Sequence, residues 1–269
     1  MDFTAHVITI DQVGKRFDGK STLALDGVSA TITPGEFVAV IGRSGAGKTT
    51  LLRCLAGATT PSAGHIWIGG FDLGSLRGRA LRAHRARVGM IYQQFNLVRR
   101  LRVLDNVLVG RLPHLRGWRR GAATLRAFGV EERACALRCL DHVGLLDRAW
   151  QRADTLSGGE QQRVAIARLL AQDARVVLAD EPVASLDVAN GRLVMETLRR
   201  IARGAGLTVV ATLHHVDYAR RYADRVLGLK DGRLLFDGPP SELTDASLFE
   251  IFGVLPGELP DDAPLLAAS

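Results

Sequence analysis

The sequence predicts an α/β fold in which a mainly parallel β-sheet is covered by helices on both faces. Short apolar runs typical of buried strands alternate with segments whose apolar residues have helical spacing. The strand-like runs lie at residues 36–41, 176–179 and 208–213. The first run ends in a glycine turn that opens a helical segment at residues 48–56. Strands alternating with helices along the chain favour a parallel sheet.

Further short strands are expected in the first part of the chain. Residues 7–10 and 30–33 alternate between apolar and polar side chains, as half-buried strands do. A third short run, at residues 65–68, is bracketed by proline and glycine residues that break regular structure.

The C-terminal third continues the alternation of strands and helices. Residues 192–203 have helical spacing. Residues 226–229 and 234–236 flank the tripeptide Lys-Asp-Gly at 230–232, which predicts a β-hairpin. The tail from residue 255 contains three prolines, so we expect it to be frayed or loosely docked.

The middle of the chain, about residues 73–172, is rich in arginine and has a helical composition. Its least patterned stretch is residues 113–126. Cys135 and Cys139 are four residues apart, so they share one face if this segment is helical. The chain has three cysteines without a Cys-x-x-Cys pair, and its start lacks a secretory signal, so we expect reduced thiols in the cytoplasm.

Length and composition are those of a soluble globular protein. The 269 residues are 47% hydrophobic and 23% charged, which argues against a disordered, coiled-coil or collagen-like chain. No apolar run approaches about 18 residues, so no membrane-spanning segment is predicted. The 35 basic and 28 acidic residues leave a net charge of +7. This excess indicates either an anionic partner or a surface of solvated arginines.

A phosphate-binding loop is predicted at residues 42–49, Gly-Arg-Ser-Gly-Ala-Gly-Lys-Thr, between a strand and a helix. Its glycines let backbone N–H groups converge on an anion, and the following helix directs its positive end there. Lys48 would reach the β- and γ-phosphates, and the Thr49 hydroxyl would bind Mg²⁺. The alternative is a glycine-rich turn beside a core helix. The residues expected to bind the nucleotide here are Gly42, Arg43, Ser44, Gly45, Ala46, Gly47, Lys48, Thr49 and Thr50.

A pair of carboxylates, Asp180 and Glu181, ends the apolar run at residues 176–179. A strand end delivers both to the edge of the sheet where the phosphate loop is expected. Asp180 suits Mg²⁺, through its water, and Glu181 suits the base that polarises an attacking water. The alternative is a solvated turn.

A second glycine-bearing helix start precedes the apolar-periodic stretch at residues 164–171. It consists of Ser157, Gly158 and Gly159, and it predicts a second anion site for which one chain has no obvious use. With the phosphate loop, the sequence Leu-Ser-Gly-Gly-Glu-Gln-Gln-Arg at residues 156–163 resembles the ATP-binding subunit of ATP-binding cassette (ABC) transporters. The resemblance implies that two copies meet head to tail, so that Ser157 and Gly159 of one cover the γ-phosphate held by the other. Glu160 departs from the usual glutamine and adds negative charge.

The resemblance also implies roles for single residues elsewhere in the chain. Phe17 matches the aromatic residue that stacks on adenine. Gln93 matches the glutamine that senses Mg²⁺ and the attacking water, with the adjacent Gln94 as the competing candidate. Asp187 ends a loop, residues 184–187, that crosses the dimer interface. His214 matches the histidine that contacts the γ-phosphate, and the competing candidate is His215.

For the whole chain, the resemblance implies a P-loop NTPase with a RecA-like core, an N-terminal antiparallel β subdomain and an inserted α-helical subdomain at about residues 95–165. The ATP-binding domain is expected at residues 5–245 and a C-terminal tail at 246–269. ATP and Mg²⁺ are the implied ligands. The implied partners are a second copy of the chain, integral membrane permease subunits gripped at the insert, and a separate solute-binding protein. The implied location is the cytoplasmic face of the bacterial inner membrane, as a peripheral subunit.

Four stretches, residues 90–98, 149–155, 179–187 and 213–225, resemble more narrowly the ATPase of bacterial phosphonate importers. Three alternatives stay open: an ATPase for another small solute or for lipoprotein release, a non-transport ATPase of the carbon–phosphorus lyase system, and a nucleic-acid-binding ATPase. No nucleic acid is expected, because the arginine clusters lack the interleaved aromatic residues of a base-stacking surface. These clusters contain Arg77, Arg79, Arg82, Arg85, Arg87, Arg99, Arg100 and Arg102.

Overall fold

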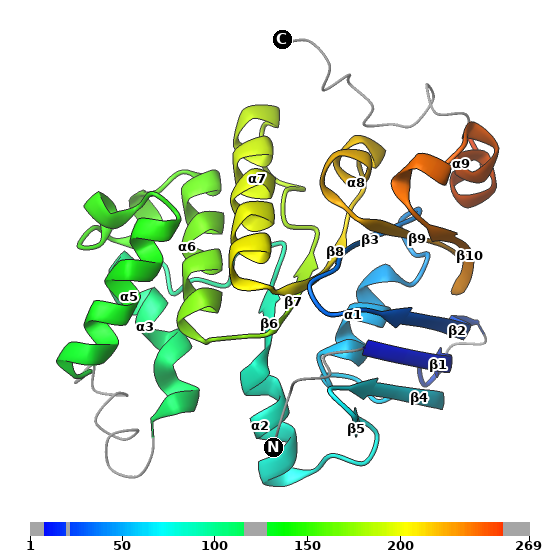
Figure 1. The fold of residues 1–269 in the computed structure, drawn as a ribbon, viewed down its shortest axis with the longest axis horizontal. Coiled ribbons are helices and arrows are strands. Elements are labelled where there is room, and N and C mark those ends of the chain that lie inside the picture. Colours follow the sequence, from blue (N-terminus) through cyan, green and yellow to red (C-terminus); the bar gives the residue numbers. More distant parts are fainter. Residues whose placement is uncertain (1–7, 20–21, 116–127, 255–269) are drawn as a thin grey trace.

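The structure contains two β-sheets: β6, β7 and β8 of the larger one lie in the middle of the view, and the smaller one lies at the lower right (Figure 1). The computed structural model describes residues 8–19, 22–115 and 128–254. Within these residues, the four-stranded sheet has the order β2-β1-β4-β5 and is antiparallel. Its strands are β1 (Ile8–Arg16), β2 (Leu23–Ile32), β4 (Ala63–Ile68) and β5 (Phe71–Asp72). This sheet confirms the expected N-terminal antiparallel β subdomain.

The larger sheet has six strands in the order β10-β9-β3-β8-β7-β6. The neighbours from β9 to β6 are parallel, and only β10 pairs antiparallel, with β9. The sheet contains β3 (Phe37–Ile41), β6 (Val88–Ile91), β7 (Val176–Asp180), β8 (Thr208–Thr212), β9 (Arg225–Lys230) and β10 (Arg233–Gly238). The mainly parallel sheet and the hairpin around residues 230–232 are therefore confirmed.

Alternate side chains of β3 enter two different hydrophobic cores. Phe37, Ala39 and Ile41 pack with the helices on one face of the sheet. Val38 and Val40 pack on the other face with α1 (Lys48–Leu55) and the antiparallel sheet. Helices were expected on both faces of the parallel sheet. This holds fully for the first face only, because the second face is covered by α1 together with the strands of the antiparallel sheet. The helices of the first face are α6 (Gly158–Ala171), α7 (Val188–Ala205), α8 (Val216–Tyr222) and α9 (Asp245–Phe252).

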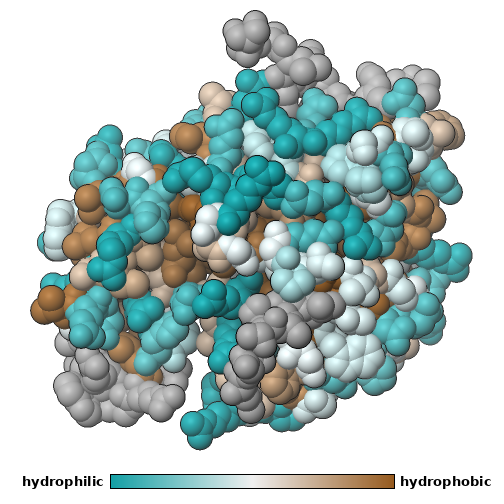
Figure 2. Space-filling view, viewed as in Figure 1, coloured by the Kyte–Doolittle hydropathy of each residue, from teal (hydrophilic) through white to brown (hydrophobic). Residues whose placement is uncertain are grey.

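The helical subdomain packs against α6 at one side of the core (Figure 1). It contains α3 (Val103–Leu108), η1 (Val109–His114), α5 (Val130–His142), η2 (Leu146–Arg148) and η3 (Ala153–Thr155). Cys135 and Cys139 both lie on α5, and the three cysteines of the chain are free. Apolar residues gather over this subdomain in Figure 2, and its exposed side chains include Val98, Leu146 and Trp150.

Two elements differ from the expectation. Residues 88–91 lie in the region expected to be helical, yet they form the edge strand β6, directly after α2 (Gly78–Arg87). Four residues after an arginine-rich helix carry too little periodicity to reveal a strand. Gly89 lets β6 approach α6, because a Cβ there would lie 2.7 Å from Leu169.

The segment expected as a tail from residue 246 begins inside α9. Leu248, Ile251 and Phe252 are buried, and α9 packs on β9 and β10. Gly228 leaves the space that Ile251 fills, since a Cβ on Gly228 would lie 2.4 Å from the Ile251 Cδ1 atom. Residues 246–252 are therefore part of the folded core. The expectations for residues 5–7 and for the chain from 255 onward, and most of the unpatterned stretch 113–126, lie outside the described residues.

In the part of the chain that the structure describes, no helix combines the length and the apolarity that crossing a bilayer requires. A short 3₁₀ helix, η4 (Pro240–Glu242), lies between β10 and α9 in the chain.

We expect Leu52→Ala to lower the free energy of unfolding by about 2–5 kcal/mol, because Leu52 is fully buried in the core between α1 and the sheets. Urea denaturation followed by circular dichroism measures the loss. Leu193→Ala on α7 is the matched control, since that side chain is 41% exposed and its truncation should change stability by less than about 0.5 kcal/mol. Equal losses would contradict this packing.

Candidate functional site

The phosphate loop connects β3 to α1 and depends on glycine at two close approaches. Gly42 and Gly47 have φ angles of 146° and 104°, which favour glycine. A Cβ on Gly42 would lie 2.2 Å from the Leu229 carbonyl oxygen, and one on Gly47 would lie 2.5 Å from that of Ala24. The loop is therefore pressed between two strands of different sheets, and its backbone leads into the N-terminus of α1 without intervening side chains.

Lys48 is the first residue of α1 and is only 4% exposed. Its ammonium group donates to the carbonyl oxygens of Gly42 at 2.6 Å and Arg43 at 3.0 Å. Burial lowers the pKa of Lys48, and the nearby carboxylates of Glu181 and Asp180 act in the opposite direction. The chain thus places a partly desolvated cation inside the phosphate loop, facing two carboxylates.

Asp180 ends β7 beside α1 and is hydrogen-bonded by two hydroxyl groups. The Oγ1 atoms of Thr49 and Thr212 each donate to its Oδ1 atom at 3.0 Å. Thr212 is fully buried at the end of β8, and its hydroxyl also accepts the backbone N–H of Glu181 at 2.9 Å. One threonine therefore positions both carboxylate residues. Thr212 could not be predicted from the sequence, because a threonine that ends a strand carries no signal of its own.

A hydroxyl and a carboxylate next to a phosphate loop fit Mg²⁺. This ion takes oxygen ligands and is usually held by one or two protein groups together with substrate phosphates. Among the described residues no group of three or more His, Cys, Asp or Glu side chains forms a complete metal cage. Thr49 and Asp180 therefore match the mode of binding that needs a nucleotide to complete it.

Glu181 and His214 lie side by side beyond the ends of β7 and β8. The Nε2 atom of His214 is 2.5 Å from the Oε1 atom of Glu181. Because an ionised carboxylate only accepts, His214 donates in this contact. His215 instead packs edge-on against Tyr218, with ring centroids 5.6 Å apart. Of the two histidines considered from the sequence, the geometry favours His214.

Glu181 has a φ of 49°, in the left-handed region. A non-glycine residue in this region costs on the order of 1–3 kcal/mol and persists only where its surroundings hold it. The hydroxyl of Thr212 provides one such restraint through the Glu181 N–H. With this backbone, the carboxylate of Glu181 contacts His214.

Gln93 and Phe17 lie on connections at the edge of the site. Gln93 follows β6 and is exposed. Among the described residues, no hydrogen bond joins its side chain to Asp180 or Glu181. Gln94 is exposed as well, so the structure does not separate the two candidates. Phe17 directly follows β1, is half-buried and has the ammonium of Lys15 5.2 Å from its ring centroid.

The second predicted anion site begins α6. Ser157 caps the helix: its Oγ accepts the N–H of Glu160 at 3.3 Å, while the Glu160 carboxylate accepts the N–H of Ser157 at 2.9 Å. Glu160 also lies 3.7 Å from the Arg148 guanidinium. A glutamate serves this capping box as well as a glutamine does. The unexpected negative charge at Glu160 is therefore engaged locally.

Asp187 caps α7 beside this helix start. Its carboxylate accepts the backbone N–H of Asn190 at 3.0 Å and the Asn190 side-chain amide at 2.6 Å, and these hydrogen bonds lower the pKa of Asp187. Asn190 in turn requires Gly159, because a Cβ on Gly159 would lie 2.7 Å from the Asn190 Oδ1 atom. Sequence reasoning did not identify Asn190, which joins the two helix starts.

The two predicted phosphate sites of one chain belong to helices on opposite faces of the six-stranded sheet. The phosphate loop leads into α1, whose apolar residues belong to the core on one face. The segment from Ser157 to Gly159 opens α6, whose apolar residues belong to the core on the other face. The structure thus brings Thr49, Asp180 and Glu181 together and leaves Ser157 apart from them.

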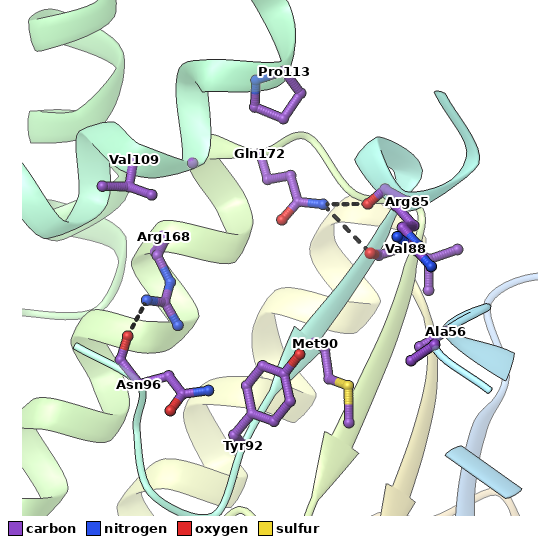
Figure 3. Close-up of a pocket in the computed structure, with 12 residues that line it drawn as sticks. Ala56, Arg85, Val88, Met90, Tyr92, Asn96, Val109, Pro113, Arg168 and Gln172 are labelled. Atoms are coloured by element: carbon purple, nitrogen blue, oxygen red, sulfur yellow. Dashed lines mark hydrogen bonds between the residues drawn. The ribbon is translucent and has the colours of Figure 1, made fainter. Parts of the chain in front are cut away.

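A cavity of about 540 Å³ opens between β6, η1 and the C-terminal half of α6 (Figure 3). Two arginines, Arg85 and Arg168, line it, and no carboxylate is among its described lining residues. Arg85 belongs to the arginine cluster of α2, which is exposed at Arg79 and Arg82 as well. Apolar side chains, including Met90 and Val109, form much of the remaining wall.

These features define a phosphate-loop ATPase of the cassette type, and comparison with known proteins agrees. A family model described as ABC transporter matches residues 25–184. The chain therefore belongs to the ABC transporter family, as an ATP-binding subunit that couples ATP hydrolysis to transport. A dimeric ATP-binding cassette solved in a post-hydrolysis state with ADP and Pi is 33% identical, with a TM-score of 0.75 over 87% of this chain and 98% of that one.

Closer relatives narrow the resemblance. The chain is 48% identical to the phosphonates import ATP-binding protein PhnC of Rhodopseudomonas palustris (strain BisB5), over 97% of this chain and 95% of the relative. It is 50% identical to the protein of the same name from Agrobacterium fabrum, over 91% of this chain and 84% of the relative. The predicted resemblance to phosphonate-import ATPases is confirmed.

We expect Thr212→Val to lower the free energy of unfolding by about 1–3 kcal/mol, because valine keeps the shape of the buried Thr212 side chain but leaves the partly buried Glu181 N–H unpaired. Thermal and urea unfolding measure the change. Thr212→Ser retains the hydroxyl and should lose clearly less. If serine and valine destabilise the protein equally, packing rather than the hydrogen bond explains Thr212.

Proposed function

We propose that this chain is the ATP-hydrolysing subunit of a bacterial phosphonate importer. It would act as a homodimer bound to permease subunits at the cytoplasmic face of the inner membrane, with a separate solute-binding protein. The observation that carries the proposal is the meeting of Lys48, Thr49, Asp180, Glu181 and His214 at the carboxyl edge of one sheet. The names of the relatives support the substrate class.

Each group at this edge has a task that its chemistry suits. Backbone N–H groups of residues 42–47 and the Lys48 ammonium would bind the phosphates of ATP, with Thr50 on the same turn. Thr49 and Asp180 would hold Mg²⁺, which neutralises phosphate charge when bound. Phe17 would stack on the adenine.

Hydrolysis would depend on the pair of Glu181 and His214. Glu181 would accept a proton from the attacking water, because its carboxylate lies at the end of β7 beside the phosphate loop. His214 holds that carboxylate in place through a 2.5 Å contact, and its N–H would move from Glu181 to the γ-phosphate when ATP is bound. Gln93, on the loop after β6, would approach Mg²⁺ and the water as a further polar group.

Two copies are needed to complete the site. The sheet separates the phosphate loop from the segment at Ser157–Gly159 within one chain. A head-to-tail pair would place that segment over the γ-phosphate of its partner, with Asp187 near the shared interface. Dimeric cassettes among the solved structures support this arrangement.

The cavity beside β6 is the proposed docking site for the permease. It lies where the helical subdomain meets the core, and it joins apolar walls to two cationic side chains. A cytoplasmic helix of the permease, with apolar and acidic residues, would fit this lining.

We expect Glu181→Gln to lower the hydrolysis rate by about 10²–10⁴-fold while ATP still binds, because glutamine keeps the shape and loses the proton-accepting charge. Unhydrolysed ATP should then hold two copies together, so light scattering should report a dimer with Mg-ATP and a monomer without it.

The matched control is Glu181→Gln combined with Ser157→Arg, which should stay monomeric because an arginine blocks the helix start that faces the partner's phosphate. Hydrolysis by Glu181→Gln at the wild-type rate would disprove the role of Glu181. A dimer that still forms with Ser157→Arg would disprove the head-to-tail arrangement.

The substrate class is tested with the assembled transporter. We expect ATP hydrolysis by the complex in proteoliposomes to rise when the solute-binding protein is loaded with methylphosphonate, and to stay basal with inorganic phosphate or with no solute. Stimulation by another solute alone would contradict phosphonate import. Purification of the chain with soluble lyase subunits instead of a permease would favour the carbon–phosphorus lyase alternative.

A further inference from the structure

Two side chains of α6 reach across the cavity to the two ends of β6 (Figure 3). Gln172, which caps the helix, donates to the carbonyl oxygens of Arg85 and Ala86 before β6, each at 3.0 Å. One turn earlier, Arg168 donates to the carbonyl oxygens of Asn96 at 2.6 Å and Phe95 at 3.2 Å, after β6. The helix is therefore tied by hydrogen bonds to both ends of the strand whose following loop carries Gln93.

The two residues that Arg168 contacts are in unusual conformations. Phe95 and Asn96 have φ angles of 52° and 47°, and neither is glycine. Consecutive left-handed residues of this kind persist only where neighbouring groups hold them. A guanidinium presents two parallel N–H groups in a rigid fork, so one arginine can hold both carbonyl oxygens at once.

Arg168 has few other partners in the described part of the chain. Within the described part of the chain, Arg168 belongs to no ion pair. Burial lowers the pKa of its guanidinium. Its donors are directed to the loop, so movement of the loop would leave a partly desolvated cation without those acceptors. The contact thus restrains the loop and the helix together.

The same loop also touches the other end of α6. A Cβ on Gly158 would lie 3.7 Å from the Cζ atom of Phe95, so the Phe95 ring lies near the helix start at Ser157. Gln93, two residues before Phe95, is consequently linked to the segment that would cover the partner's γ-phosphate. Arg168 also lines the proposed permease site.

We propose that Arg168 is a positioning residue for the loop that carries Gln93: its fork holds Phe95 and Asn96 in their left-handed conformation and so fixes Gln93 relative to α6. This inference rests on the proposed function only for the role of Gln93 in ATP hydrolysis. Anything that occupies the cavity and contacts Arg168 would act on Gln93 through this connection, which makes Arg168 a point of transmission from permease to site.

The link between Arg168 and the loop is tested without ATP. In the full chain, Arg168→Met should speed amide hydrogen exchange of residues 92–98 by about tenfold, because the loop loses its restraint. The control is Arg111→Met: Arg111 is also half-buried and donates to a backbone carbonyl of α6, that of Ala171 at 3.0 Å, away from the loop. Arg111→Met should leave exchange of residues 92–98 within about twofold.

Arg168→Lys guards against a general loss of folding. Lysine keeps the positive charge, but its ammonium lacks the planar fork, so exchange of residues 92–98 should rise here too while exchange of the sheet stays at the wild-type rate. Unchanged exchange of residues 92–98 in both variants, or an equal rise in Arg111→Met, would overturn the inference.

The connection to Gln93 is tested with a double-mutant cycle. Arg168→Met should lower kcat by about 10–100-fold and change the KM for ATP by less than about threefold, because the effect reaches the reaction through a misplaced group. In a Gln93→Ala background the same change should alter kcat by less than about twofold. If the losses of kcat caused by Arg168→Met and by Gln93→Ala simply add in the double variant, the inference is overturned. A wild-type kcat in Gln93→Ala with faster loop exchange in Arg168→Met would instead refute the role proposed for Gln93 and leave the positioning of the loop established.

Discussion

The parallel register of β3, β8 and β7 is the constraint on which the site depends. Val40 pairs with Thr212, and Thr212 pairs with Asp180. Because parallel strands end at the same edge of a sheet, the phosphate loop after β3, Glu181 after β7 and His214 after β8 meet there. A slip of one residue in β8 would turn the Thr212 side chain to the opposite face and remove its hydroxyl from Asp180. The chemistry is thus a consequence of strand pairing between distant segments.

The same sheet is the basis of the proposal that two copies complete the site. Its two faces belong to different cores, and each face supports one glycine-bearing helix start. Gly47 opens α1 on one side, and Ser157 opens α6 on the other. Within one chain these two starts therefore belong to helices on opposite faces of the sheet. In the head-to-tail pair proposed above, each phosphate loop would instead face the other copy's helix start.

Site residues that directly follow a long apolar run could be predicted from the sequence. The phosphate loop and the pair Asp180–Glu181 follow apolar runs long enough to identify as strands, so their meeting at one edge was predictable. Thr212 and Arg168 were not, because their importance comes from which segments lie opposite them, and a single sequence does not contain that information. The edge strand at residues 88–91 was hidden for a related reason: its four residues are held by neighbouring α6 and β7 more than by their own periodicity.

Strain and its restraint recur at the two polar loops of the site. Glu181, Phe95 and Asn96 all have left-handed backbones, and in each case a side chain from a neighbouring element hydrogen-bonds to the strained backbone. Thr212 on β8 accepts the N–H of Glu181, whereas Arg168 on α6 donates to the two carbonyls of the loop. The restraint on Glu181 comes from within the sheet, so it is as rigid as the core. The restraint on the loop comes from α6, the helix against which α3 and α5 of the helical subdomain pack, so the geometry of the loop follows that helix. A base held by the sheet and a glutamine held through α6 would come into register only when α6 keeps its place beside β6, and Arg168 on that helix also lines the cavity where the permease is proposed to bind.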